Sequence, residues 1–371
     1  MLKLLVITDA HLITQNGQKV AYAPYVKEMD LWMSLVDHTT FICPNKIKGP
    51  LLGKPFEIQD FKQIGLRRLE FHTLFSALIS MITIPYQAIV LWNAMRQADH
   101  VHVRCPGNLA LLACLIQITL PRKRKTVKYA GNWDPKSKQP LAYSIQKWIL
   151  SNTSLTKNMQ VLVYGEWLGM TKNIKPFFTA SYYDNEKEPI IDREFEQPLK
   201  AMFVGTMGAN KRPLETVQLI KSLRSSGLDI TLEMYGNGPV VEDIKWYRKE
   251  NGVLDHIVIR GNQPGHVVKE AYKNADLLIL LSKSEGWPKV VAEAMFWGVV
   301  PIVSSVSCVP WMIGNDKRGI LIHDPEHIDV EYLRKQITNK EALVQMSNEA
   351  AEWSRQYTMD TFAKEIKKLL Q

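Results

Sequence analysis

Short apolar segments rich in Val, Ile and Leu recur along the chain, with helical stretches between them. In the first half they are LKLLVIT (2–8), TTFIC (39–43), HVHVR (100–104), TVKYA (126–130) and VLVYG (161–165). In the second half they are AMFVG (201–205), ITLEMYG (230–236), HIVIRG (256–261), ADLLILLS (275–282), VVPIVS (299–304) and GILI (319–322). Continuous apolar strands that alternate with helices are typical of parallel sheets covered on both faces. The pattern therefore predicts an α/β protein with two doubly wound domains.

The domain boundaries are predicted from length and from one polar stretch. A chain of 371 residues is too long for one ordinary core and suits two domains. Residues 182–198 (YYDNEKEPIIDREFEQP) are polar, acidic and contain two prolines, which is typical of a linker. We therefore expect an N-terminal domain over 1–181, a linker over 182–199 and a second domain over 200–355. Residues 356–371 should form a closing amphipathic helix that starts after Thr358 and packs back on the first domain.

The net positive charge of the chain comes entirely from its first half. Residues 1–200 hold 25 Lys and Arg against 16 Asp and Glu, whereas residues 201–371 hold 21 of each. The densest tract is Arg122, Lys123, Arg124 and Lys125, directly after the apolar stretch 108–120. This combination suits contact with an anionic membrane face, or else a buried helix followed by a solvated charged turn. A nucleic-acid partner is not expected, because zinc-finger spacing and a ribonucleoprotein signature are both missing from the sequence.

Cysteine spacing and apolar run lengths indicate the compartment. The four cysteines have no CxxC spacing, so neither a zinc site nor a disulfide framework is expected and a reducing compartment fits best. Asp9 ends the first apolar run too early for a signal peptide. The apolar windows 77–92 and 108–120 are each shorter than a membrane span. We expect a cytoplasmic protein without a spanning helix, at most peripheral at the inner face of the cytoplasmic membrane.

Candidate chemistry lies in the stretch KSEGWPKVVAEAMFWGVVPIVS (283–304). It follows the apolar strand 275–282, turns at 284–287, and continues as a helix with Pro288 at its first position and Gly298 at its end. Ligands of open parallel sheets bind at the carboxyl ends of strands, where helix N-termini favour a diphosphate. The carboxylates of Glu285 and Glu293 would then accept hydrogen bonds from sugar and ribose hydroxyls. The alternative is that both are ordinary solvated surface carboxylates.

The run E-G-W-P-K-V-V-x-E-A, followed by W-G-V-V-P-I-V-S, resembles the E-x7-E signature of retaining glycosyltransferases of family 4, which belong to the group 1 glycosyltransferases. The resemblance implies the GT-B fold: two Rossmann-like domains facing a central cleft, with the donor nucleotide mainly on the second. It implies that Glu285 acts on the donor sugar and that Gly286, Trp287, Pro288, Lys289 and Glu293 bind the donor.

A second stretch supports this resemblance at the expected interval. FVGTMGANKR (203–212) resembles the first strand and loop of the second domain in that family, with Gly205 at the turn. Lys211 matches the lysine that holds the donor diphosphate. Thr206 stands where the family often has an arginine, so Arg212 is considered as its substitute. The alternative is that Lys211 is an ordinary loop lysine.

The resemblance is thinner over the first half. Asn16 and Gly17 correspond to the glycine loop of the family, and Arg104 and Asn132 lie in tracts that face the acceptor there. Many members have a histidine in the second tract, where this chain has Gly131, Asn132 and Trp133, so no histidine role carries over. The alternative for all these residues is turn chemistry and packing.

The resemblance implies a retaining transferase that moves a sugar from a nucleotide diphosphate donor to a glycan or lipid-linked acceptor, as in bacterial lipopolysaccharide or capsule assembly. No cofactor is expected. A metal is not expected either, because the sequence has no Asp-x-Asp to hold one. The rival interpretations are a sugar-nucleotide epimerase of the same fold and a non-catalytic sugar or lipid-binding protein. A dehydrogenase is disfavoured, since G-x-G-x-x-G does not follow the first strand.

Overall fold

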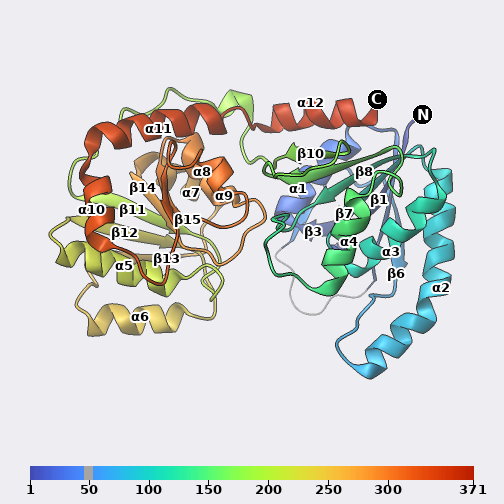
Figure 1. Cartoon of the computed structure of the whole chain (residues 1–371), viewed down its shortest axis with the longest axis horizontal. Helices are drawn as coiled ribbons and strands as arrows, with labels where there is room; N and C mark the ends of the chain where they lie inside the picture. Colours follow the sequence, from blue (N-terminus) through green and yellow to red (C-terminus); the bar gives the residue numbers. More distant parts are fainter. Residues whose placement is uncertain (46–52) are drawn as a thin grey trace. The chain divides into compact units, whose positions relative to one another are not determined.

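The computed structural model describes residues 1–45 and 53–371, which form two compact units (Figure 1). Unit 1 comprises Met1–Phe178 together with the last residues, Ala363–Gln371. Unit 2 comprises Thr179–Phe362. Each unit is built around its own parallel sheet, as the alternation of apolar strands and helices predicts.

Unit 1 contains a seven-stranded sheet with the order β10-β9-β8-β7-β1-β4-β6. All its neighbouring strands pair in parallel; Val6, for example, lies opposite Phe41 on one side and His102 on the other. A second, small antiparallel sheet has the order β2-β3-β5. The strands of the large sheet are β1 (Lys3–Ile7), β4 (His38–Pro44), β6 (Lys62–Leu66), β7 (His100–Cys105), β8 (Arg124–Tyr129), β9 (Met159–Tyr164) and β10 (Ile174–Phe177), and those of the small sheet are β2 (Ile13–Gln15), β3 (Gln18–Tyr22) and β5 (Gly53–Pro55).

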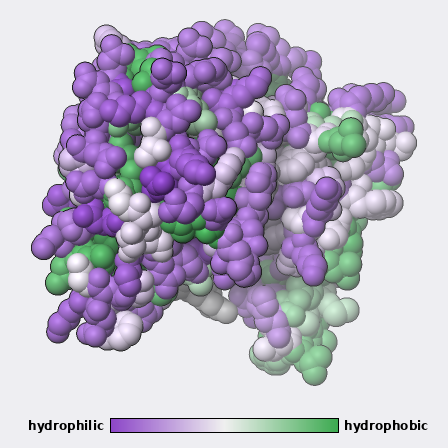
Figure 2. Space-filling model, turned by 60° about the vertical axis from the view of Figure 1, so that its left-hand side comes forward, coloured by the Kyte–Doolittle hydropathy of each residue, from purple (hydrophilic) through white to green (hydrophobic). Residues whose placement is uncertain are grey.

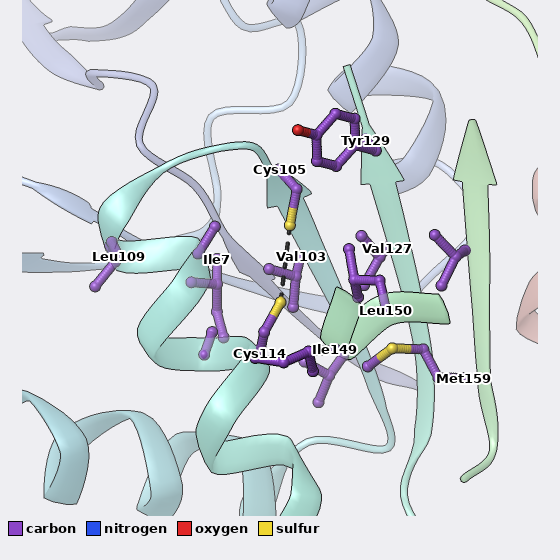
Figure 3. Close-up of a cluster of buried hydrophobic side chains, with 14 of the residues drawn as sticks. Ile7, Val103, Cys105, Leu109, Cys114, Val127, Tyr129, Ile149, Leu150 and Met159 are labelled. Carbon is purple, nitrogen blue, oxygen red and sulfur yellow. Dashed lines mark hydrogen bonds between the residues drawn. The ribbon is translucent and has the colours of Figure 1, made fainter. Parts of the chain in front are cut away.

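Within its described residues, unit 1 also contains four α-helices and the end of α12. They are α1 (Ala23–Met33), α2 (Leu74–Gln97), α3 (Asn108–Ile116) and α4 (Leu141–Ser151), with a 3₁₀ turn over Gln117–Thr119. Helix α3 contacts both α2 and α4, so the three lie side by side. Figure 3 shows the core under them, where Val103 and Val127 from the sheet lie near Cys114 of α3 and Ile149 of α4.

Helix α2 overturns one expectation. Its 24 residues run through Pro85, past both ends of the apolar window 77–92, and its length and composition alone would allow it to cross a membrane. The helix starts early because Thr73 caps it, with the Thr73 and Ser76 side chains bonding each other's backbone N–H groups. Pro85 is exposed on the helix and does not end it. Counting only the apolar window 77–92 therefore underestimated the length of the helix.

Unit 2 contains a six-stranded parallel sheet with the order β13-β12-β11-β14-β15-β16. The strands are β11 (Leu199–Val204), β12 (Ile230–Tyr235), β13 (Ile257–Gly261), β14 (Leu277–Leu280), β15 (Val300–Ser304) and β16 (Ile320–Ile322). The helices are α5 (Pro213–Ser225), α6 (Val241–Glu250), α7 (Gly265–Asn274), α8 (Lys289–Phe296), α9 (Val309–Met312), α10 (Val330–Thr338), α11 (Lys340–Ser354) and the first turn of α12 (Met359–Leu370), with a 3₁₀ turn over Asp184–Glu186. Helix α8 packs on β14, β15 and α11.

The end of α8 and the start of α12 agree with the sequence signals. Pro288 directly precedes α8, and Gly298 follows it in the left-handed region at φ 74°. The Val299 N–H donates to the Ala294 carbonyl, which satisfies an orphan carbonyl at the end of the helix. Thr358 caps α12 by accepting a hydrogen bond from the Thr361 N–H at 3.2 Å. The predicted end of α8 at Gly298 and the predicted start of α12 after Thr358 are thus confirmed, whereas Pro288 is the N-cap of α8 and not its first residue.

Two buried histidines in β7 share one hydroxyl. His100 Nε2 lies 3.0 Å and His102 Nδ1 2.9 Å from the Thr126 Oγ1 of the neighbouring strand. Burial lowers the pKa of His100 to about 4, and it lowers the pKa of His102 well below the ordinary value of 6.5. Both rings are therefore neutral parts of the unit 1 core at neutral pH.

We expect unit 1 to lose stability in mild acid because of these histidines. A histidine with a lowered native pKa is protonated first in the unfolded chain, so its contribution is complete above about pH 6.5 and is lost as the pH falls towards 4. For His100 the loss should reach about 3 kcal/mol. Urea unfolding of unit 1 at pH 7 and pH 4.5 should show a smaller loss in His100→Gln than in wild type. His38→Gln, which changes an exposed histidine, should behave as wild type; equal losses in all three proteins would contradict the assignment.

Candidate active site

The turns that follow the unit 2 strands lie at one edge of the sheet. Because the strands are parallel, their carboxyl ends meet there, and ligands of such sheets bind at that edge. The turns after β11, β12, β14 and β15 are residues 205–212, 236–240, 281–288 and 305–308. The first and third of these hold the residues that the sequence motifs single out.

The turns after β11 and β12 touch through their backbones. The Gly205 N–H donates to the Tyr235 carbonyl and the Met207 N–H donates to the Asn237 carbonyl, both at 2.9 Å. A Cβ atom on Gly236 would lie 1.9 Å from the Gly205 carbonyl oxygen, and Gly236 has φ 136°. Only glycine fits this position, so the GxG sequence sets the spacing of the two turns.

Lys211 and Glu285 form an ion pair at this edge, although 74 residues separate them. Their side chains are 22% and 9% exposed, so the pair is largely shielded from water. Two further bonds join the same turns: the Lys283 N–H donates to the Asn210 carbonyl at 2.8 Å, and Asn210 Nδ2 donates to the Ser284 carbonyl at 3.0 Å. The structure therefore brings together a cation and a carboxylate that two separate sequence motifs predicted as site residues.

The turn over Gly286, Trp287 and Pro288 is held from one side by packing. The Cys308 thiol donates to the Gly286 carbonyl at 3.0 Å. The Trp287 ring is buried and stacks on Trp353 at 6.2 Å, which in turn meets Trp311 edge-on at 5.3 Å. The Trp287 side chain thus packs against other aromatic rings and supports the turn.

Helix α8 presents its N-terminus at the same edge. No side chain caps its first turn, where Lys289 follows the buried Pro288. The positive end of the helix dipole and the first-turn amides favour an anion at such a position. The edge therefore combines an ammonium group, backbone amides and a carboxylate.

Glu293 lies further along α8 and has different partners from Glu285. Its Oε1 accepts from the Ser181 hydroxyl at 2.5 Å and its Oε2 from the Tyr272 hydroxyl at 3.2 Å. Burial raises the pKa of Tyr272 well above its ordinary value, and the nearby Glu293 raises it further, so the phenol remains a donor. Glu293 is neither fully exposed nor fully buried, and its contacts show that it suits hydroxyl donors.

Arg212 takes a structural position directly before α5. Its backbone is left-handed, with φ 49°, and its Nη2 lies 2.7 Å from the Glu326 carboxylate. The Arg212 side chain is only 9% exposed. Lys211 pairs with Glu285, whereas the guanidinium beside it in sequence pairs with Glu326.

The acceptor-side candidates in unit 1 make local contacts. Asn16 and Gly17 form the turn of the β2–β3 hairpin with φ 51° and 76°, the combination that a two-residue type I′ turn needs. Asn132 Oδ1 accepts a hydrogen bond from the Asp134 N–H at 2.8 Å, which closes a turn. Each residue thus has a turn role that its sequence already suggests.

Arg104 belongs to a buried charge cluster that the sequence did not reveal. It pairs with Glu28 of α1, whose Oε1 also lies 3.0 Å from Lys128 Nζ of β8. The Arg104 guanidinium lies 5.3 Å from the Tyr25 ring centre. Two cations therefore share one carboxylate in the interior of unit 1. The one available signal in the sequence was a lysine within the apolar strand TVKYA.

Three residues of the basic tract 122–125 have hydrogen-bond acceptors within unit 1. Lys125 is only 3% exposed, its Nζ donates to the Leu120 carbonyl at 2.8 Å, and burial lowers its pKa to about 8. Lys123 Nζ donates to the Ala98 carbonyl at 2.7 Å, and Arg124 Nη1 to the Gln371 carbonyl at 2.6 Å. The prediction is wrong for Lys125, because a strand residue in the sheet core cannot reach a membrane.

Comparison with known proteins finds similarity to glycosyltransferases. Residues 184–353 match the family of glycosyl transferases group 1. The lipopolysaccharide 1,6-galactosyltransferase of Salmonella typhimurium is 30% identical over 119 residues, which cover 30% of this chain and 31% of that protein. The putative colanic acid biosynthesis glycosyltransferase WcaL of Escherichia coli is 26% identical over 132 residues, 34% of this chain and 32% of that protein. The aligned part is thus about a third of each relative.

Solved structures resemble the whole chain. The apo form of the lipopolysaccharide outer core galactosyltransferase WaaB has a TM-score of 0.68 at 17% identity, with 99% of both chains covered. Anabaena HepE, solved with UDP and glucose, has a TM-score of 0.66 at 12% identity, also with 99% of both chains covered. These similarities, together with the two parallel sheets, confirm the GT-B fold.

We expect Gly236→Ala to disturb the site through its backbone. The added Cβ would meet the Gly205 carbonyl oxygen at 1.9 Å, so the two turns must move apart. The free energy of unfolding of unit 2, measured in urea, should fall by about 1–3 kcal/mol. Gly252→Ala, where φ is also positive but nothing lies within 4 Å, is the matched control and should cost less. Equal losses for both variants would mean that backbone conformation alone, not the contact of the two turns, selects glycine.

Proposed function

We propose that the protein is a retaining glycosyltransferase that moves a sugar from a nucleotide diphosphate donor to a glycan or lipid-linked acceptor. The match of residues 184–353 to the group 1 family supports transfer of a sugar. The observation that carries the proposal is the shielded Lys211–Glu285 pair beside the N-terminus of α8, at the ligand-binding edge of the sheet.

The donor diphosphate would lie between Lys211 and the first turn of α8. An ammonium group has three donors, and the ion pair with Glu285 uses one of them, so two can serve phosphate oxygens. Negative charge grows on the diphosphate as it leaves, and groups already aimed at it lower the barrier without reorganisation. In this proposal the fixed ammonium and the helix amides do the work that a divalent metal does elsewhere.

Transfer would retain the configuration at the sugar carbon. The bond from that carbon to the phosphate oxygen breaks, and the acceptor oxygen forms its bond on the same face. The departing phosphate oxygen takes the acceptor proton, so no protein base is required. Glu285 orients the sugar and stabilises positive charge at the reacting carbon, while Lys211 stabilises the leaving group.

The similar proteins suggest where to look for substrates. Their names refer to lipopolysaccharide and colanic acid, and HepE was solved with UDP. We therefore propose a role in bacterial surface polysaccharide synthesis, with UDP as the first nucleotide to test. Gly205, Gly286 and Lys289 would contribute to the donor site, and Glu293 would bind the ribose.

Replacing Glu285 by Gln should abolish transfer while the fold survives. The amide keeps the size of the side chain but removes the charge that stabilises the sugar cation, and a loss of about 100-fold or more in kcat is expected. The assay is release of nucleoside diphosphate from a panel of sugar nucleotides, with and without a lipid-linked glycan acceptor. Glu326→Gln removes the exposed partner of Arg212 with the same change of charge and should retain activity.

Three results would count against this assignment. They are wild-type turnover in Glu285→Gln, conversion of the donor to an isomer without any acceptor, and donor binding without turnover in the wild-type protein. The second would indicate an epimerase and the third a binding protein. Circular dichroism and the melting temperature of each variant separate loss of chemistry from loss of folding.

Replacing Glu293 by Gln should weaken nucleotide binding. A charged hydrogen bond to a ribose hydroxyl contributes about 1.5–3 kcal/mol, so the Kd for UDP should rise about tenfold or more in calorimetry. Ser181→Ala removes a hydroxyl that bonds Glu293 but leaves the carboxylate, and it should change the Kd less. An unchanged Kd in Glu293→Gln would remove the ribose role. A thermal-shift screen over other nucleoside diphosphates should precede both measurements, because a ligand of the native state raises its melting temperature.

A further inference from the structure

The first half of α2 carries large apolar side chains that face solvent. Leu74, Phe75, Leu78, Met81 and Ile82 are between 58% and 93% exposed. Figure 1 shows these first turns extending beyond the other elements of unit 1, and Figure 2 shows apolar surface gathered on a protruding part of the molecule at the lower right. An exposed apolar patch of this extent marks an interaction surface on a protein.

The exposed face continues into the second half of the helix. Tyr86 and Ile89 are 67% and 61% exposed, and Trp92 is 37% exposed. Helix α2 contains neither Asp nor Glu, and Arg96 in its last turn is its one charged residue. The aromatic residues Tyr86 and Trp92 are of the kind enriched where a membrane meets water.

Two polar side chains of α2 point inward and fix the orientation of the helix. The Ser80 hydroxyl is buried, donates to the Glu70 carbonyl at 2.8 Å and accepts from the Glu70 N–H at 2.9 Å. Gln87 is buried and its Nε2 donates to the Arg67 carbonyl at 3.1 Å. Turning the apolar face inward would break these bonds and leave their polar atoms without partners. The fold therefore stabilises the outward orientation of the apolar face.

Positive charge lies at both ends of the exposed face. Arg67 and Arg68 precede α2 and are exposed, with Glu70 3.8 Å from Arg68 as a partial countercharge. At the other end, the Arg96 guanidinium lies 4.5 Å from the Trp92 ring centre.

A basic cavity adjoins the Arg96 end. It has a volume of about 830 Å³, and Arg96, Arg122 and Lys123 line it together with Asp99. The Asp99 carboxylate accepts a hydrogen bond from the Lys3 N–H at 2.9 Å, so cations outnumber the acidic group there. An apolar stripe bordered by cations complements the acyl chains and headgroups of an anionic membrane.

We infer that the exposed face of α2, residues 74–92, inserts into the surface of an anionic lipid bilayer. A second copy of the chain fits less well, because an antiparallel pair would place Arg67 and Arg68 beside Arg96 and a parallel pair would place Arg96 beside itself. Both arrangements bring like charges together, whereas an anionic bilayer meets every one of these cations favourably. This inference does not depend on glycosyl transfer.

The helix lies in the plane of the bilayer and does not cross it. Its inner face holds Ser80 and Gln87 against residues 67–70, and it buries Leu91 and Met95 in unit 1. Crossing would require α2 to leave that core, while insertion of its outer face requires no change in the unit. Arg96 and the neighbouring cavity would then sit at the level of the headgroups.

Vesicle flotation of the full chain tests the inference without any donor or acceptor. Wild-type protein should float with vesicles of phosphatidylcholine and phosphatidylglycerol, and more weakly with phosphatidylcholine alone. The triple variant Phe75→Ser, Leu78→Ser and Ile82→Ser should lose at least about tenfold in partitioning. These side chains are exposed, so its melting temperature should remain that of wild type. The matched control changes three exposed apolar residues of unit 2, Trp246→Ser, Leu254→Ser and Tyr332→Ser, and should float as wild type.

Separate experiments test the role of the arginines beside α2 and whether the protein is bound only at the surface of the bilayer. Arg67→Gln and Arg68→Gln should each reduce binding to the anionic vesicles by about fivefold and leave binding to phosphatidylcholine unchanged. Alkaline carbonate should release the bound protein, as it does peripheral proteins. The inference is overturned if wild type floats with neither vesicle, if the triple variant floats as wild type, or if carbonate fails to release it. It is also overturned if gel filtration shows a lipid-free dimer that the triple variant dissolves, since the occupant would then be a second copy.

Discussion

The parallel order of the unit 2 sheet is the constraint on which the candidate site depends. Lys211 and Glu285 follow β11 and β14, which are neighbours in the sheet, so their turns emerge side by side. Hydrogen bonds from Asn210 and to its carbonyl then lock these turns to each other. The contact of Gly236 with Gly205 sets the distance between the turns after β11 and β12, because any side chain on Gly236 would meet the Gly205 carbonyl oxygen. The ion pair is thus a product of strand order and backbone fit, and a diphosphate would enter an arrangement that is already in place.

The apolar pattern predicted the central strands of both large sheets and the edge strands of the unit 2 sheet, but it missed the edge strands of the unit 1 sheet. All eleven predicted segments are strands, and they include every inner strand of both large sheets. The strands missed in the unit 1 sheet are β6 and β10, which lie at its two edges, where one side of the strand meets solvent and the sequences KQIGL and IKPF need not be continuously apolar. The hairpin β2–β3 was missed as well, although its Asn16–Gly17 turn is a strong local signal, because its strands are short and partly polar.

The same reasoning explains which site residues could be found in advance. Lys211 and Glu285 stand in turns, where a charged side chain after an apolar strand is visible in the sequence as a break in the pattern. Glu28, Lys128 and Lys125 lie inside helices and strands, where a single charge looks like a solvated position until its partners are known. Pairing across the fold decides whether such a charge is buried. Ser181 and Tyr272 bind Glu293 from distant segments for the same reason, so no local pattern could have nominated them.

Helix α2 shows that the composition of a helix does not by itself determine which of its side chains are buried. Its composition is that of a buried helix, yet the residues that it buries include Ser80 and Gln87 while Leu and Phe face outward. A core helix would bury its apolar face and leave the polar side chains in water, because each exposed Leu or Phe forgoes about 1.5–3 kcal/mol of burial. In unit 1 the backbone carbonyls of Glu70 and Arg67 supply partners for the inward polar groups and stabilise this inverted arrangement. Apolar side chains that face solvent, with arginines at both ends of their face, are what the proposed insertion into an anionic bilayer requires.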